Sequence, residues 1–160
     1  MSKRIIGIDP GSKGFACVYC DGAYSHVPLK DSQKDFGFGR EFIALLRSLD
    51  KEDIVVIEKV MAIHGVGSTS TFNFGASWGM VLGALMCLGI PYELVTPKRW
   101  QNTMWNPTDR TGDTKSSSYN AARRLHPDMD FRRTEKCRNF DDNKVDATLI
   151  CDYGRRLFSV

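Results

Sequence analysis

Three acidic residues stand where the surrounding sequence is otherwise apolar. Asp9 ends an Ile-Ile-Gly-Ile run, Glu58 ends an Ile-Val-Val-Ile run, and Asp146 lies inside a helical pattern between Val145 and Ala147. One acid at a strand end usually caps a turn, but three at the ends of neighbouring elements favour a common site. Burying an unpaired carboxylate costs on the order of several kcal/mol, and Mg²⁺ prefers carboxylate oxygens. The pattern therefore predicts a divalent metal site.

The elements that must position these acids alternate between strand and helix patterns. Short β-branched runs at 4–9, 14–20 and about 23–28, with an Asp-Gly turn signal at 21–22, predict an antiparallel meander. The further elements expected are a helix at 38–49, a buried strand at 53–58, a helix at 72–89, a strand at 91–95, a short helix from 96–97, a helix at 113–125 and a helix at about 142–157. Segments 64–71 and 128–139 are expected to be loops, the second one mobile. This order indicates one α/β domain over 1–160, with a five-stranded mixed sheet flanked by helices.

Charge is distributed unevenly along the chain. Residues 96–138 contain ten Lys and Arg against five Asp and Glu, whereas the whole chain of 160 residues has a net charge of only +3. A basic segment on a slightly acidic body is typical of a protein that binds a polyanion, although it also fits a solvated, charge-rich surface.

The stretch 72–90 carries no charged residue, so a membrane span has to be considered. It contains Asn73, Ser77 and four glycines, and no second span exists. Gly75, Gly79 and Gly83 are spaced four apart, which permits close helix packing. The pattern favours a core helix that also meets a partner subunit.

Three motifs in this chain resemble those of the RuvC family of Holliday-junction resolvases, members of the ribonuclease H-like superfamily. They are the segments 6–12 (Ile-Gly-Ile-Asp-Pro-Gly-Ser), 57–60 (Ile-Glu-Lys-Val) and 144–150 (Lys-Val-Asp-Ala-Thr-Leu-Ile). Order and spacing agree over essentially the whole chain. The loose match to cellular members indicates a phage-type member.

The resemblance implies hydrolysis of phosphodiesters by two Mg²⁺ ions, with Mn²⁺ able to substitute, held by Asp9, Glu58, Asp142 and Asp146. Asp9 would bridge the ions, and the products would carry 5′-phosphate and 3′-hydroxyl ends. Relatives commonly have the fourth acid three residues before the last one, where this chain has Asn143. Asp142, four residues before Asp146, shares that helix face and is the expected ligand, with Asp141 the less favoured choice.

The resemblance also implies where DNA is held. Lys115 matches a phosphate-contacting lysine of relatives, and Lys98 and Arg99 belong to a turn that lies near the site in relatives. Contacts of this kind increase affinity for DNA but do not recognise its base sequence. In the loop after Glu58, Met61 takes the place of an aromatic wedge in some relatives, and His64 is a candidate DNA contact. Trp100 and Trp105 are expected in the core.

Several readings remain open at this point. A sugar-kinase-like ATPase would need two such lobes, for which 160 residues are too few. A flap or fork nuclease would share the metal site, and a non-catalytic binder of branched DNA would have lost one of the acids. The dyad of a Holliday junction predicts a homodimer, with the 72–89 helix at or near its interface. The N-terminus has no secretory pattern, so we expect a cytoplasmic protein, in the host if phage-encoded.

Overall fold

The computed structural model describes residues 3–32, 34, 36–59 and 67–159. Its centre is a mixed sheet in the order β3-β2-β1-β4-β5. The strands are β1 (Ile5–Asp9), β2 (Phe15–Cys20), β3 (Ala23–Pro28), β4 (Ile54–Glu58) and β5 (Tyr92–Val95). The first three are antiparallel neighbours, and β4 and β5 run parallel to β1. The predicted five-stranded mixed sheet and its meander are confirmed, and β1 lies at the centre.

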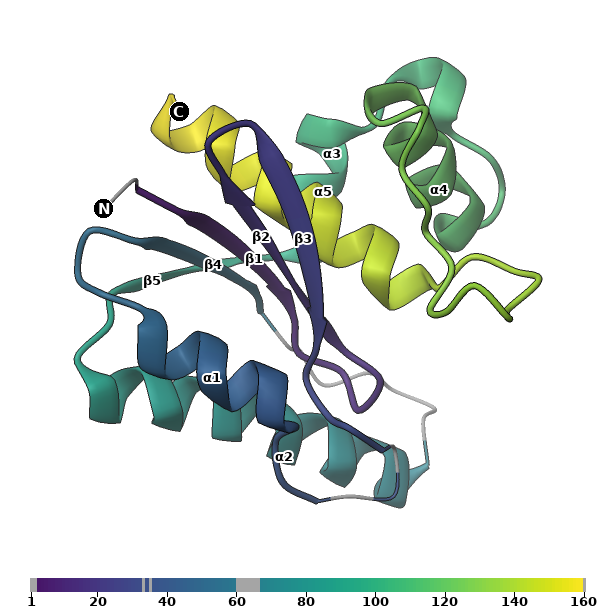
Figure 1. Ribbon diagram of the computed structural model, residues 1–160. Coiled ribbons are helices and arrows are strands. Elements are labelled where there is room, and N and C mark those ends of the chain that lie inside the picture. Colours follow the sequence, from purple (N-terminus) through teal and green to yellow (C-terminus); the bar gives the residue numbers. More distant parts are fainter. Residues whose placement is uncertain (1–2, 33, 35, 60–66, 160) are drawn as a thin grey trace.

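Helices cover both faces of this sheet (Figure 1). On one face lie α1 (Arg40–Ser48) and α2 (Ser68–Leu88), and on the other lies α5 (Asp142–Phe158). Packed against α5 are α3 (Pro97–Met104) and α4 (Thr114–Leu125), joined by the short 3-10 helix η1 (Pro107–Asp109). This is the arrangement expected for a ribonuclease H-like fold.

Alternation along β1 decides which side chains meet which layer. Ile6 and Ile8 belong to the core that α1 and α2 complete, whereas Ile5 packs with residues of α5. Gly7 lies on the α5 side, and a Cβ there would come within 2.2 Å of the Cys151 backbone nitrogen. Glycine is therefore required at this position because it lets α5 lie directly on β1, with Asp9 further along the same face.

Local turn chemistry fixes several boundaries as expected. Asp21 and Gly22 both have positive φ, 48° and 84°, which is the backbone of a tight two-residue hairpin. Asp113 caps α4 by accepting a hydrogen bond from the Ser116 amide at 2.8 Å. By contrast, α2 begins at Ser68, inside the segment expected to be a loop.

The segment 128–139 contains no helix or strand, as predicted, and several of its residues contact other elements. Phe131 is buried in the core beside α4 and α5. Arg132 forms an isolated bridge with Phe140, and the Arg133 side chain pairs with Asp141 at 2.6 Å. Arg133 thus ties the segment to the start of α5.

Among the described residues, α2 is the one helix long and apolar enough to cross a membrane by length and composition, which is weak evidence for a span. It packs on the sheet through a narrow face formed by Ser77, Val81 and Leu85. Phe72 and Met86 are 67% and 63% exposed. The expected core helix therefore buries one stripe only and leaves a broad apolar surface free.

Candidate functional site

Two of the predicted acids meet at the carboxyl ends of neighbouring parallel strands. The register pairs Ile8 of β1 with Ile57 of β4, so Asp9 and Glu58 follow side by side. Asp9 is buried, and its Oδ1 accepts a hydrogen bond from the Gly11 amide at 3.3 Å. The turn after β1 thus holds one Asp9 oxygen.

The third acid, Asp146, comes from α5, which the absence of a side chain at Gly7 brings against β1. Its Oδ1 is buried and has no hydrogen-bond partner. The hydroxyl of Ser118, a buried residue of α4, hydrogen-bonds the same carboxyl group and lowers its pKa. An unpartnered buried carboxylate oxygen is costly, and it marks this position as incomplete without a ligand.

Electrostatic interactions with neighbouring carboxyl groups raise the pKa of Asp9 and of Asp146. Burial, followed by the charges of Asp146 and Glu58, raises the pKa of Asp9 well above its ordinary value. Burial also raises the pKa of Asp146 to about 7, and Glu58 adds to that effect. The Glu58 pKa is raised by burial and lowered by a hydrogen bond from Trp100. Within the described part of the chain, none of the three forms an ion pair with a basic side chain.

Asp142 and Asp141, the two candidates for a fourth ligand, have different surroundings. Asp142 is 36% exposed and pairs with Lys115 at 2.6 Å, and its charge raises the pKa of both Asp9 and Asp146. Asp141 caps α5 by accepting hydrogen bonds from two backbone amides, and its other oxygen pairs with Arg133. Both oxygens of Asp141 are therefore used to hold the start of α5, whereas Asp142 lies near the acidic set.

Asn143, at the position where relatives commonly have the fourth acid, lies near Asp9. Its Nδ2 donates to Asp141 Oδ1 at 3.1 Å, which orients the amide. A Cβ built on Gly11 would lie 3.5 Å from Asn143 Oδ1 and 3.7 Å from Asp9 Oδ1, so both oxygens border the same small space.

The predicted DNA contacts are only partly described. Lys115 is 66% exposed in the first turn of α4, and Lys98 and Arg99 are exposed in the first turn of α3. Met61 and His64 lie outside the described residues. A hollow of 430 Å³ borders Asp142 and Asn143, and its lining includes the basic residues Lys13, Arg133 and Arg138.

The chemistry of this set fits a divalent cation. Among the residues that the structure describes, no three His, Cys, Asp or Glu side chains stand close enough together to form a ready-made metal site. The buried, unpartnered oxygen of Asp146 and the mutual repulsion around Asp9 are nevertheless what a cation would relieve.

Trp100 was predicted from the sequence to lie in the core, but its contact with the acidic set was not predicted. It is fully buried, as expected. Its indole Nε1 also donates to Glu58 Oε2 at 2.6 Å, across 42 positions of sequence. The only sequence signal for this contact was the position of Trp100 one turn after the strand that pairs with β4.

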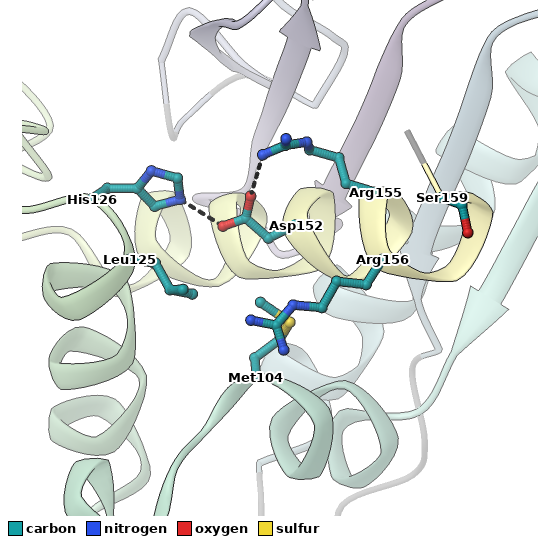
Figure 2. Close-up of a pocket in the computed structure, with 7 residues that line it drawn as sticks. All are labelled: Met104, Leu125, His126, Asp152, Arg155, Arg156 and Ser159. Carbon is teal, nitrogen blue, oxygen red and sulfur yellow. Dashed lines mark hydrogen bonds and ion pairs between the residues drawn. The ribbon is translucent and has the colours of Figure 1, made fainter.

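A separate cavity of 500 Å³ lies near the end of α5, and none of the acidic set lines it (Figure 2). Its polar centre is Asp152, which pairs with His126 at 2.6 Å and with Arg155 at 3.6 Å. His126 follows the last residue of α4. These contacts join α4 to α5, so the cluster has an evident structural role.

No protein-family model and no curated protein matches this chain. Solved structures do resemble it. Thermus thermophilus RuvC in complex with a Holliday junction substrate has 14% sequence identity and a TM-score of 0.57, covering 98% of this chain and 96% of that one. A second structure of Thermus thermophilus RuvC has 15% identity and a TM-score of 0.51, covering 97% and 96%. The chain therefore has the RuvC fold over nearly its whole length.

Proposed function

We propose that this protein is a RuvC-type, metal-dependent endonuclease that cuts Holliday junctions and related branched DNA. The fold supports the proposal over nearly the full length of the chain. The observation that carries it is the set of Asp9, Glu58 and Asp146, three carboxyl groups that form no ion pair with a basic side chain in the described residues. Asp146 and Glu58 raise the pKa of Asp9, and Glu58 also raises that of Asp146.

In this proposal, Asp9, Glu58 and Asp146 hold divalent cations, Mg²⁺ or Mn²⁺, with Asp142 as the fourth acid. Two such ions would lower the pKa of an attacking water and stabilise the leaving 3′-oxygen. The protein's own part is to hold the carboxylates in place: the Gly11 amide holds Asp9, the Trp100 indole holds Glu58 and the Ser118 hydroxyl holds Asp146. Each is a neutral donor, so the negative charge of the set is preserved for the metal.

The DNA backbone is held by exposed basic residues next to the acids. Lys115 is the best placed, because its Nζ already pairs with a carboxylate of the site and can exchange that partner for a phosphate. Lys98 and Arg99 extend the basic surface along α3. The hollow lined by Lys13, Arg133 and Arg138 offers a second path for a strand beside the start of α5.

The active species in this proposal is a homodimer. A four-way junction has a dyad, so paired cuts need two sites related by two-fold symmetry. The free surface of α2 suits such a contact, since Phe72 and Met86 are exposed and a Cβ at Gly75, Gly79 or Gly83 would meet nothing within 4 Å. A second copy could therefore approach that helix closely.

Cleavage of a four-way junction, a fork and a linear duplex in Mg²⁺ tests the proposal, with Asp9→Asn and Asp146→Asn as controls. We expect the wild type to cut the junction in preference to the duplex and both variants to be inactive. Preference for the fork would indicate a flap or fork nuclease on this fold. Junction binding without any cutting would indicate a non-catalytic binder, and normal cutting by both variants would refute the assigned site.

A further inference from the structure

The hydrogen bond between Trp100 and Glu58 bears on how Glu58 would bind a metal ion. The inference drawn from it rests on the proposed function. Glu58 Oε2 accepts the indole N–H at 2.6 Å. In the described parts of the chain, Glu58 has no other hydrogen bond from a side chain and no ion pair, which leaves Oε1 without a protein partner. One carboxylate oxygen is thus anchored and the other is available.

The backbone around the pair makes this anchor rigid. Glu58 pairs with Val95 across β4 and β5, and the Lys59 amide donates to the Val95 carbonyl at 2.7 Å. Two residues after Val95, Pro97 starts α3, which brings Trp100 back over the end of β4. Trp100 is fully buried among core residues, so its ring cannot swing away from Glu58.

The chemistry of the donor also matters. An indole N–H donates but cannot accept a hydrogen bond and carries no charge. It therefore favours the ionised carboxylate over the protonated one without neutralising it, unlike a lysine or arginine. We infer that Trp100 is a positioning residue that fixes Glu58 through Oε2 and presents Oε1 as the single oxygen for a divalent cation.

Trp105 provides a matched control within the same fold. Its ring lies 6.3 Å from that of Trp100, at an interplanar angle of 88°. Its Nε1 is also buried but has no hydrogen-bond partner. Replacing either tryptophan by phenylalanine removes an indole with a buried N–H from the same cluster, yet only Trp100→Phe removes a contact to the acidic set.

The test is Mn²⁺ binding followed by electron paramagnetic resonance on the full-length wild type, Trp100→Phe and Trp105→Phe. Partners that orient metal ligands typically contribute 10-fold or more to affinity, so we expect Trp100→Phe to weaken Mn²⁺ binding by about tenfold. Trp105→Phe should bind as the wild type does. Equal Mn²⁺ affinity of the two variants would overturn the inference, whereas a wild type that neither binds Mn²⁺ nor cuts DNA would overturn the proposed function instead.

A second measurement stands even if Trp100→Phe fails to fold. The chain has three tryptophans, so its nuclear magnetic resonance spectrum should contain three indole N–H signals. The signal of Trp100 is the one that remains in both the Trp78→Phe and the Trp105→Phe variant. A hydrogen bond to a carboxylate should place it downfield of the Trp105 proton, and Glu58→Gln should move it upfield. A Trp100 resonance that does not respond to Glu58→Gln would contradict the inference.

Discussion

At the scale of single residues, the site is defined by charge that the protein leaves uncompensated. Asp146 is the clearest case, because one of its oxygens is buried without a partner and its pKa is raised to about 7. The folded protein therefore holds a proton on this group that the unfolded chain has released above its ordinary pKa of 3.8. Without metal, the contribution of Asp146 to folding stability is therefore greatest below about pH 4 and falls as the pH rises towards 7.

This linkage gives a prediction for Asp146→Asn. The amide cannot ionise, so the variant should be more stable than the wild type at pH 8 in the absence of metal, by about 1–3 kcal/mol, and the gap should close towards pH 4. Urea unfolding in a chelating buffer at several pH values measures it. Adding Mg²⁺ at pH 8 should stabilise the wild type but not the variant; a pH-independent difference would contradict the assignment.

The neighbouring acids Asp141 and Asp142 should separate into a structural and a functional role. Asp141→Ala removes the cap of α5 and the partner of Arg133, which should lower the free energy of unfolding by about 1–2 kcal/mol while cleavage persists. Asp142→Asn should leave unfolding nearly unchanged and slow junction cleavage by about tenfold or more. The reverse pattern would assign the fourth ligand to Asp141.

At the scale of elements, the site depends on how closely α5 lies on β1. A Cβ at Gly7 would meet the backbone of Cys151 and Ala147 at 2.2 Å and 2.5 Å, where no flexible side chain can yield. Gly7→Ala should therefore destabilise the protein by about 3 kcal/mol or more. Gly11→Ala is the matched control, since its nearest contact is at 3.5 Å. Equal melting temperatures of the two variants would contradict this packing.

The elements that could be predicted from sequence are those with a local signal. The apolar runs that end in Asp9 and Glu58, and the Asp-Gly hairpin at 21–22, carry their own pattern, and the strands appear where that pattern is. The start of α2 was placed four residues late because Ser and Thr also occur in loops. The segment 128–139 is a loop as predicted, but the contacts of Phe131 and Arg133 could not be predicted because they involve other elements.

Contacts at the site between residues far apart in the sequence could not be predicted. Asp9, Glu58 and Asp146 were identified because acids are rare in apolar patterns, and in the structure the charges of Asp146 and Glu58 act on Asp9. Nothing in the local sequence pairs Trp100 with Glu58, since that contact depends on the parallel pairing of β4 and β5. Asn143 was weighed only as a departure from relatives, although its oxygen borders the space beside Asp9.

At the scale of the whole molecule, the free surface of α2 predicts the oligomeric state. Sedimentation at micromolar concentration should give a homodimer, with and without junction DNA. Met86→Lys should shift it to monomer, because it places a charge in the apolar contact. Leu157→Lys on α5, also an exposed apolar position, is the control and should remain dimeric. A wild-type monomer, free or bound to DNA, would contradict the dimer.

We propose that the acidic set makes this RuvC-like fold a metal-dependent junction endonuclease. The most direct test is single-turnover cleavage of a four-way junction by the wild type and Asp9→Asn, with binding measured in Ca²⁺ and cutting started by Mg²⁺. We predict that both proteins bind the junction, that only the wild type makes paired nicks, and that it does so only with Mg²⁺ or Mn²⁺. Wild-type cutting in chelator, or undiminished cutting by Asp9→Asn, would contradict the claim.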